Sequence, residues 1–215
     1  MRRIGCVAGL ILMLAGCASP DAERVRGYNQ DGVDLYAHGQ YDSARESFQA
    51  ALNLQPDDPA LHYNVGQCYE RMGNGAKAEE FYNACLQRDP DHAACRHSLS
   101  MLLVSEKREQ DAARAVQAWL ARSPKNAAAL AEDGWLWRQQ GDLPRAQSRL
   151  QEALTLNPRD WRALSELAAV YEAQQRLDRA LVLYEQSLEE NPNQPDVAKH
   201  LNDMRLKGVQ RPKPE

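Results

Sequence analysis

The chain has 215 residues, of which 43% are hydrophobic, so it is long enough for one ordinary core or for a linear stack of small ones. Its formal net charge of -4 excludes the strongly basic surface that nucleic-acid binding needs, and we expect no nucleic-acid partner. With 2 Phe residues and many Ala, Leu, Gln, Arg and Glu, the composition favours helices over strands.

Residues 1–16 have the composition of a secretory signal peptide. Two arginines precede an apolar run over residues 4–14, which is too short to span a bilayer, because about 20 helical residues are needed. Residues 14–17, Leu-Ala-Gly-Cys, resemble the lipobox of bacterial lipoproteins, in which the cysteine thiolate takes up a lipid. We therefore expect cleavage before Cys17 and lipidation of Cys17; the alternative is an ordinary signal peptide with a chance cysteine.

The residues after the cysteine predict where the anchored protein lies. Ala18 and Ser19 lack the Asp that commonly retains such lipoproteins in the inner membrane, so the resemblance implies the periplasmic face of the outer membrane. Residues 17–24 are expected to form a short polar tether that keeps the folded part near the lipid surface. More than one acyl chain on Cys17 would make this membrane attachment stable.

Five prolines recur at a constant interval of 34 residues, without insertion or deletion. A fixed period of this length is typical of repeat arrays. Proline ends a helix because its ring lacks an N–H and disfavours helix in the preceding residue. The five are Pro56, Pro90, Pro124, Pro158 and Pro192. They divide the chain into units one to five, over residues 25–58, 59–92, 93–126, 127–160 and 161–194.

Other columns keep the same phase. The twentieth residue of every unit is Ala, the twenty-eighth is Leu, and large side chains fill the eleventh and twenty-fourth columns. The recurring apolar positions follow spacings of three and four, which place them on one face of each of two helices. The eighth residue is always small: Gly32, Gly66, Ser100, Gly134 and Ala168.

These columns resemble the tetratricopeptide repeat, a helix pair of about 34 residues. The resemblance covers residues 25–194 and implies an all-α, right-handed solenoid of five helix-turn-helix repeats, in which stacked pairs bury one another's apolar faces. Residues 195–207 predict a capping helix, with Val197, Leu201 and Met204 on one side. The glycine, prolines and charges of residues 208–215 predict a disordered tail.

Two acidic residues depart from the family pattern. Asp31 and Asp133 occupy the seventh position of their units, where the family prefers a large apolar side chain. A buried carboxylate is costly unless it is paired. We therefore expect both side chains to tilt toward solvent.

Potential metal ligands come close together in sequence at His92, Cys95 and His97. Imidazole and thiolate suit Zn or Cu, but this spacing matches no ligand pattern, and the helical register points the three side chains in different directions. We expect no metal and no cofactor. A metal-handling or catalytic periplasmic protein that uses these residues is the alternative from a different functional class.

Three thiols other than the lipidated one remain in the mature chain, so at most one internal pair can form. Cys85 stands at a core position and predicts a packed free thiol, whereas Cys68 and Cys95 lie on adjacent first helices without a disulfide being assigned. The sequence contains no nucleophile elbow, phosphate-binding loop, HExxH helix or CxxCH motif. We therefore expect no enzymatic activity.

In the tetratricopeptide family, positions 2, 5, 6, 9, 12 and 13 of each first helix face a concave surface, and this resemblance names candidate partner-binding residues. Trp135 is the expected anchor, or else it packs against an adjacent helix, while Trp137 falls on the core face because residues two apart diverge by about 200°. The predicted binding residues are Tyr63, Asn64, Gln67, His97, Met101, Trp135 and Arg138.

Some members of the family clamp a C-terminal carboxylate with Lys at position 5, but no unit here has Lys at that position, which disfavours this ligand. We expect a membrane-tethered scaffold or adaptor of the bacterial cell envelope. It would bind a partner protein or peptide on the concave surface and would be a monomer. A pilotin-like assembly factor for a pilus or secretion system, and self-association through the groove, are the alternatives.

Overall fold

The structure is a computed structural model that describes residues 20–211. Within this range it contains eleven α-helices and no strand, which confirms the all-helical repeat fold. None of these helices is long and apolar enough to cross a membrane. The helices are α1 (Pro20–Ala37), α2 (Tyr41–Leu54), α3 (Pro59–Arg71), α4 (Gly75–Arg88), α5 (Ala93–Ser105), α6 (Glu109–Arg122), α7 (Ala127–Gln139), α8 (Leu143–Leu156), α9 (Trp161–Ala173), α10 (Leu177–Glu190) and α11 (Pro195–Leu206).

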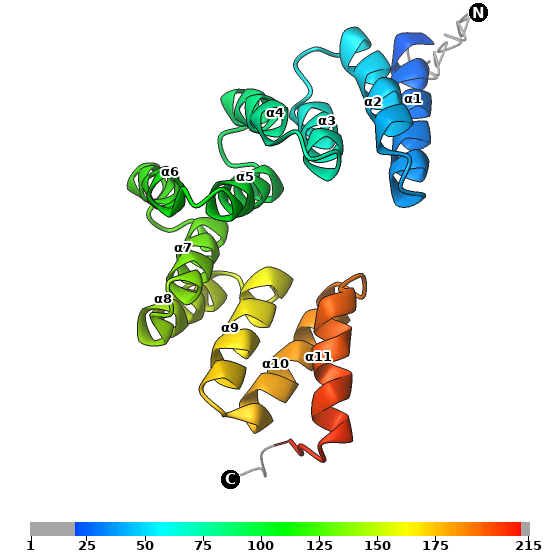
Figure 1. Cartoon of the computed structure of the whole chain (residues 1–215). Helices are drawn as coiled ribbons and strands as arrows, with labels where there is room; N and C mark the ends of the chain where they lie inside the picture. Colours follow the sequence, from blue (N-terminus) through cyan, green and yellow to red (C-terminus); the bar gives the residue numbers. More distant parts are fainter. Residues whose placement is uncertain (1–19, 212–215) are drawn as a thin grey trace, which may run out of the picture.

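The helix pairs follow one another along a curve (Figure 1). Helices α3, α5 and α7 lie on the inner side of this curve, and α4, α6 and α8 lie on the outer side. The chain passes from α1 at the upper right, around α6 at the left, to α11 at the lower right. In these three repeats the first helix is therefore the one that faces the hollow of the solenoid.

The residue before each of units two to five caps the helix that follows. Helices α3, α5, α7 and α9 begin at the first residues of units two to five. Asp58 accepts hydrogen bonds from the backbone N–H groups of Ala60 and Leu61, and Asp160 accepts the corresponding pair in unit five. Such side chains satisfy the free N–H groups at a helix start, which explains why the helices begin where they do.

Helix α1 begins at Pro20, earlier than the start of unit one at residue 25. Proline is well tolerated in the first turn of a helix, and the acidic Asp21 and Glu23 are favourable near the positive end of its dipole. Residues 20–24 of the expected tether are therefore helical. The signal peptide, Cys17 and the rest of the tether lie outside the described residues.

The small and large columns of the sequence meet inside the repeats. A Cβ atom added to Gly66 would lie 2.7 Å from a ring carbon of Tyr82, and one added to Gly134 would lie 2.6 Å from Cγ of Leu150. The same close approach joins the first and second helices of unit one. These three pairs therefore pack at a separation that only a small residue allows. Ala at the twentieth position is fully buried in all five units.

Helix α11 closes the C-terminal end, as the sequence predicts. Leu201 and Met204 are buried in the same hydrophobic cluster as Tyr184 of the last repeat. The turn before the helix is held by the buried side chain of Gln194, whose Nε2 donates to the backbone oxygen of Ser187 at 2.9 Å. The open apolar end of the array is thereby covered.

The expectation for Asp133 was wrong. Its side chain is buried, with 3% of the residue exposed, whereas Asp31 is exposed as expected. Gln117 of α6 donates to Asp133 Oδ1 at 3.0 Å, and Arg149 of α8 places Nε 2.9 Å from Oδ2. Burial raises the pKa of this carboxyl, while Arg149 acts in the opposite direction. The helices on either side supply partners that offset part of the cost of burial, and the pKa remains raised because burial is the larger effect.

Cys68, Cys85 and Cys95 are free thiols and are buried. Cys85 and Cys95 belong to one hydrophobic cluster, and Cys68 belongs to another with unit one. Hydrogen bonding to the neighbouring Cys85 thiol, together with burial, raises the pKa of Cys95. Cys85 is therefore the packed free thiol that the repeat register predicts.

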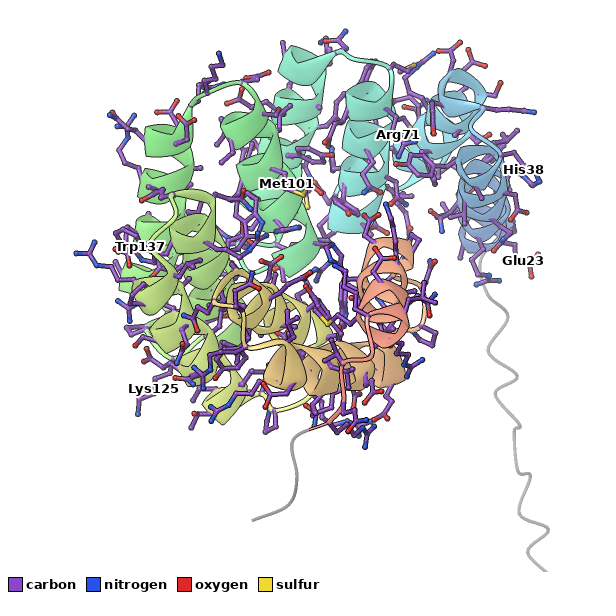
Figure 2. The ribbon with its side chains drawn as sticks, turned by 60° about the horizontal axis from the view of Figure 1, so that its bottom comes forward. Glu23, His38, Arg71, Met101, Lys125 and Trp137 are labelled. Carbon is purple, nitrogen blue, oxygen red and sulfur yellow. The ribbon has the colours of Figure 1, made fainter. Side chains whose placement is uncertain are left out.

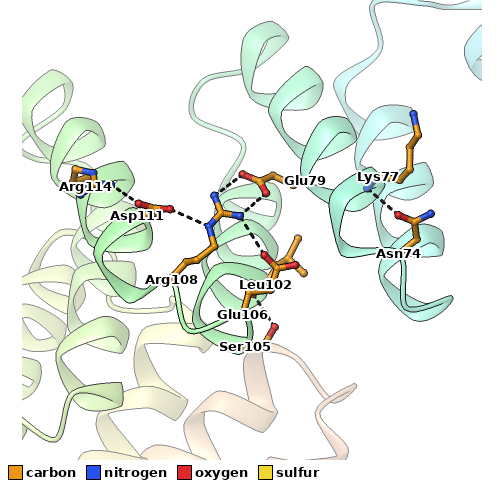
Figure 3. Close-up of polar contacts among 9 residues, drawn as sticks. All are labelled: Asn74, Lys77, Glu79, Leu102, Ser105, Glu106, Arg108, Asp111 and Arg114. Atoms are coloured by element: carbon orange, nitrogen blue, oxygen red, sulfur yellow. Dashed lines mark hydrogen bonds and ion pairs between the residues drawn. The ribbon is translucent and has the colours of Figure 1, made fainter.

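In the turn between α5 and α6, Arg108 joins unit two to unit three (Figure 3). Its guanidinium donates to both carboxylate oxygens of Glu79 on α4, at 2.7 and 3.1 Å, and to Asp111 on α6 at 2.9 Å. Glu106 in the turn after α5 accepts from the same group at 3.2 Å. A bidentate pair of this kind adds geometric specificity to the stacking of the two repeats.

Substitution of Gly66 tests the small-to-large contact. Gly66→Ala places a methyl group against the Tyr82 ring, and we expect it to lower the free energy of unfolding by about 1–3 kcal/mol. Gly27→Ala is the matched control, because Gly27 is helical and nothing lies within 4 Å of its added Cβ. It should raise the free energy by about 0.5–1 kcal/mol through helix propensity alone. Urea denaturation measures both; equal effects would contradict the packing argument.

Candidate functional site

The inner side of the curve contains a cavity of about 330 Å³. Its wall comes from α3, α5, α7 and α9, the first helices of four successive repeats. This volume lies at the lower end of the range of about 300–1,000 Å³ that small-molecule sites occupy. Side chains at positions 2, 5, 6 and 9 of the repeats supply much of the lining, so the register that builds the solenoid also builds this cavity.

A second hollow of about 600 Å³ follows toward the C-terminus. It shares Ser165 and Glu166 with the cavity and is bounded by α9 and α11 on its far side. We call the cavity and this hollow together the inner groove. The groove therefore continues along the inner face from α3 to the capping helix.

The structure gathers most of the predicted binding residues at this groove. Arg138 lines the second hollow. Asn64 lines neither part and instead donates to Asn29 Oδ1 at 3.2 Å, between α3 and α1. The residues that line the cavity are Tyr63, Gln67, His97, Met101 and Trp135.

Trp135 packs against adjacent helices, which is the second of the two alternatives that the sequence left open, and its role as an anchor for a partner stays a prediction. It is 7% exposed and packs in the hydrophobic cluster of units two to four, yet it also lines the cavity. Its ring stands edge-on to the His97 imidazole, with 5.3 Å between the ring centroids. Met101 is the exposed apolar side chain of this wall, at 46%. Trp137 is half-buried and carries the Arg145 guanidinium 4.5 Å above its ring.

A half-buried imidazole and a buried carboxylate form a pair that joins the third and fourth repeats inside the cavity. His97 Nδ1 lies 2.9 Å from Oε2 of Glu132, whose side chain is 7% exposed. Burial alone would lower the pKa of His97, but the hydrogen bond to Glu132 and its negative charge outweigh burial, so this pKa is raised. The sequence interpretation missed Glu132, although it stands at position 6, which the register assigns to the concave surface.

Carboxylates outnumber guanidinium groups along the inner groove. Five carboxylates and two guanidinium groups line it, and both cations are engaged. Arg138 donates to Glu166 at 2.7 Å, and Arg162 stacks on the Trp161 ring at 4.4 Å. The carboxylates are Glu132, Asp160, Glu166, Glu172 and Asp196. The groove therefore has the electrostatic character that attracts a cation.

The three residues of the metal hypothesis face different partners. The His92 side chain caps α5 by accepting from the backbone N–H of Cys95 at 3.2 Å. The Cys95 thiol donates to the backbone oxygen of Tyr82, and His97 pairs with Glu132. Among the residues from 20 to 211, no group of three or more His, Cys, Asp or Glu side chains is placed to hold a metal ion. The structure thus gives this hypothesis no convergent site.

Stacked helix pairs with a groove on their inner face define a helical scaffold for protein–protein interaction. Two family models, each described as tetratricopeptide repeat, match residues 31–93 and 138–201, more than half of the chain together. The chain belongs to the tetratricopeptide repeat family. This agrees with the resemblance that the sequence columns show.

Two solved structures share this architecture, and part of the sequence matches one further protein. A thermophilic tetratricopeptide repeat protein of Thermus thermophilus is 25% identical, with a TM-score of 0.66 over 85% of this chain and 99% of that one. PilF of Pseudomonas aeruginosa has the same fold, with a TM-score of 0.58, 16% identity and 88% of each chain covered. Outer dynein arm-docking complex subunit 4 of Danio rerio is 39% identical over 51 residues, which are 24% of this chain and 10% of that protein.

The pair between His97 and Glu132 predicts a stability that depends on pH. The pKa of His97 is raised by folding, so its contribution is complete below the ordinary value of about 6.5 and is lost as the pH rises through the raised pKa. The free energy of unfolding, measured in urea at several pH values, should fall over this interval. His97→Gln and Glu132→Gln should each remove that component; an unchanged slope in both variants would contradict the pairing.

Proposed function

We propose that this chain is a membrane-tethered scaffold or adaptor of the bacterial cell envelope that binds a partner protein or peptide in the inner groove. The observation that carries the proposal is the cavity built by the first helices of four successive repeats. Aromatic and apolar side chains line it beside amide, hydroxyl and charged groups. This mixture can bury an anchoring side chain of a partner and satisfy polar groups of its backbone.

The lipobox at Cys17 supports the tether, and the outer membrane, facing the periplasm, is the location that we propose. Helix α1 begins three residues after Cys17. A fully extended chain covers about 3.3–3.6 Å per residue, so three residues reach on the order of 10 Å. The first repeat would therefore lie close to the lipid surface, and the groove would meet its partner there.

Substitution of Cys17 tests the anchor. In a bacterial host that is fed alkyne-labelled palmitate, we expect the native chain to carry the label and to fractionate with membranes, and Cys17→Ser to carry none, because serine has no thiol to lipidate. Cys6→Ser is the matched control, since it removes a cysteine within the expected signal peptide. Label that persists in the Cys17 variant, or that is missing from the native chain, would contradict a lipid anchor at Cys17.

Photocrosslinking from the groove tests the scaffold. A photoreactive residue at Met101, exposed in the cavity wall, should join a partner in living cells. The same residue at Arg114, whose side chain is 73% exposed on the outer helix α6, should not join it. Mass spectrometry then identifies the crosslinked chain. Equal crosslinking from both sites would contradict recognition by the inner groove.

The same crosslink distinguishes narrower functions. A pilus or secretion-system subunit joined at Met101 supports a pilotin-like role, which a lipobox followed by repeats also favours. A second copy of this chain supports self-association and contradicts the proposed monomer. An envelope protein of another kind supports the adaptor role alone.

A further inference from the structure

Glu132 is a buried carboxylate with incomplete hydrogen bonding. Its side chain lines the cavity and is 7% exposed, and only Oε2 has a partner, His97. Oε1 has no hydrogen-bond partner among residues 20–211. A carboxylate offers about four acceptor positions on two oxygens, and a buried charge is costly unless it is paired. Glu132 therefore has acceptor capacity that the described part of the chain does not use.

The cations of the groove do not fill this capacity. Arg138 is paired with Glu166, and Arg162 lies over the Trp161 ring. Oε1 is itself buried, and a half-turn about the last side-chain bond only exchanges two equivalent oxygens. A cation in the cavity would therefore reach the carboxylate through the unused lone pair of Oε2, beside the bond to His97.

The surroundings of Glu132 fit a side chain with an apolar stem and a cationic head. Met101 provides exposed apolar surface for the methylene groups, as a lysine or arginine stem requires. Tyr63, Trp135 and Trp161 line the same cavity and can face a cation with their rings. The excess of carboxylates along the groove attracts a positively charged side chain, and exclusion of water from the cavity strengthens this attraction.

We propose that the cavity receives a lysine or arginine side chain of the partner polypeptide, whose cation binds the Glu132 carboxylate. This inference rests on the proposed function, because it takes the groove to bind a polypeptide. It gives that partner a chemistry: a basic segment, opposite in charge to the C-terminal carboxylate that lysine-bearing members of the family clamp. His97 acts as a positioning residue that holds the carboxylate at the wall of the cavity.

Selection from a peptide library tests the charge. Random nonapeptides would be selected on the immobilised full-length chain, on Glu132→Gln and on Glu80→Gln. Glu80 is the matched control, because its side chain is 62% exposed on α4, away from the cavity lining. We expect enrichment of Lys or Arg on the native chain and on the control, and none on Glu132→Gln. Circular dichroism checks that all three remain helical.

Affinity measurements on the strongest selected peptide complete the test. Replacing its basic residue by norleucine, which keeps an apolar stem, should weaken binding to the native chain about 10- to 100-fold, as loss of a charge-assisted hydrogen bond implies. Binding to Glu132→Gln should change little, because the interaction is already absent. The same 10- to 100-fold loss in both proteins would place the cation elsewhere and overturn the inference.

The possible outcomes distinguish failure of the Glu132 site from failure of the proposed polypeptide-binding groove. Peptides that are enriched without basic residues, and that bind the native chain and Glu132→Gln equally, overturn the role of Glu132 but leave a polypeptide-binding groove. No enrichment on the native chain overturns both. Basic peptides that favour the native chain only when membrane lipid is present would indicate binding to the lipid surface and would also overturn the cavity site.

Discussion

The structure depends on the contact between a small residue on the first helix of each repeat and a large one on the second. Gly66 against Tyr82 and Gly134 against Leu150 bring two backbones to a separation that a Cβ would prevent. One such pair is too small to bury its remaining apolar face. It must pack against the next pair, and the constant interval of 34 residues makes every step alike. The curve of the array follows from this repetition.

Because the array is curved, some positions of the repeat pack between helices and others line the inner groove. The small column, the Ala column and the large twenty-fourth column are buried between helices, so these positions serve packing. Positions 5, 6 and 9 of the first helices turn inward and vary from repeat to repeat: Tyr63 and His97 are polar aromatics, while Ala131 is small. Figure 2 shows Met101 among the side chains of the inner region, whereas Trp137 lies away from it and packs, partly buried, against the hydrophobic cluster of the last two repeats. The helical scaffold is the same in every repeat, but the side chains at these positions differ, and these differences give the groove its specific chemistry.

The fold could be predicted from the sequence because it is periodic, whereas details of the site depend on contacts between repeats. The column of prolines and the columns of small residues gave the helix pairs, and the buried face of α11 was readable from three apolar residues. Asp133 was misjudged because its partners, Gln117 and Arg149, come from two other helices. The pairing of His97 with Glu132 likewise joins residues 35 apart, which no local pattern reports.

Adjacent acidic residues on α7 show how a structural carboxylate differs from an available one. Asp133 and Glu132 are both buried, and each breaks the apolar pattern of its surroundings. Asp133 faces α6 and α8, where Gln117 of the third repeat donates to Oδ1 and Arg149 of the fourth forms an ion pair with Oδ2, although Oδ2 accepts no hydrogen bond within residues 20–211. Glu132 faces the cavity and has a partner on one oxygen alone. The two residues share one helix and are buried to a similar extent. Their roles therefore differ because of the direction that each side chain faces, and only the Glu132 carboxylate, which lines the cavity, is placed to bind a cation of a partner.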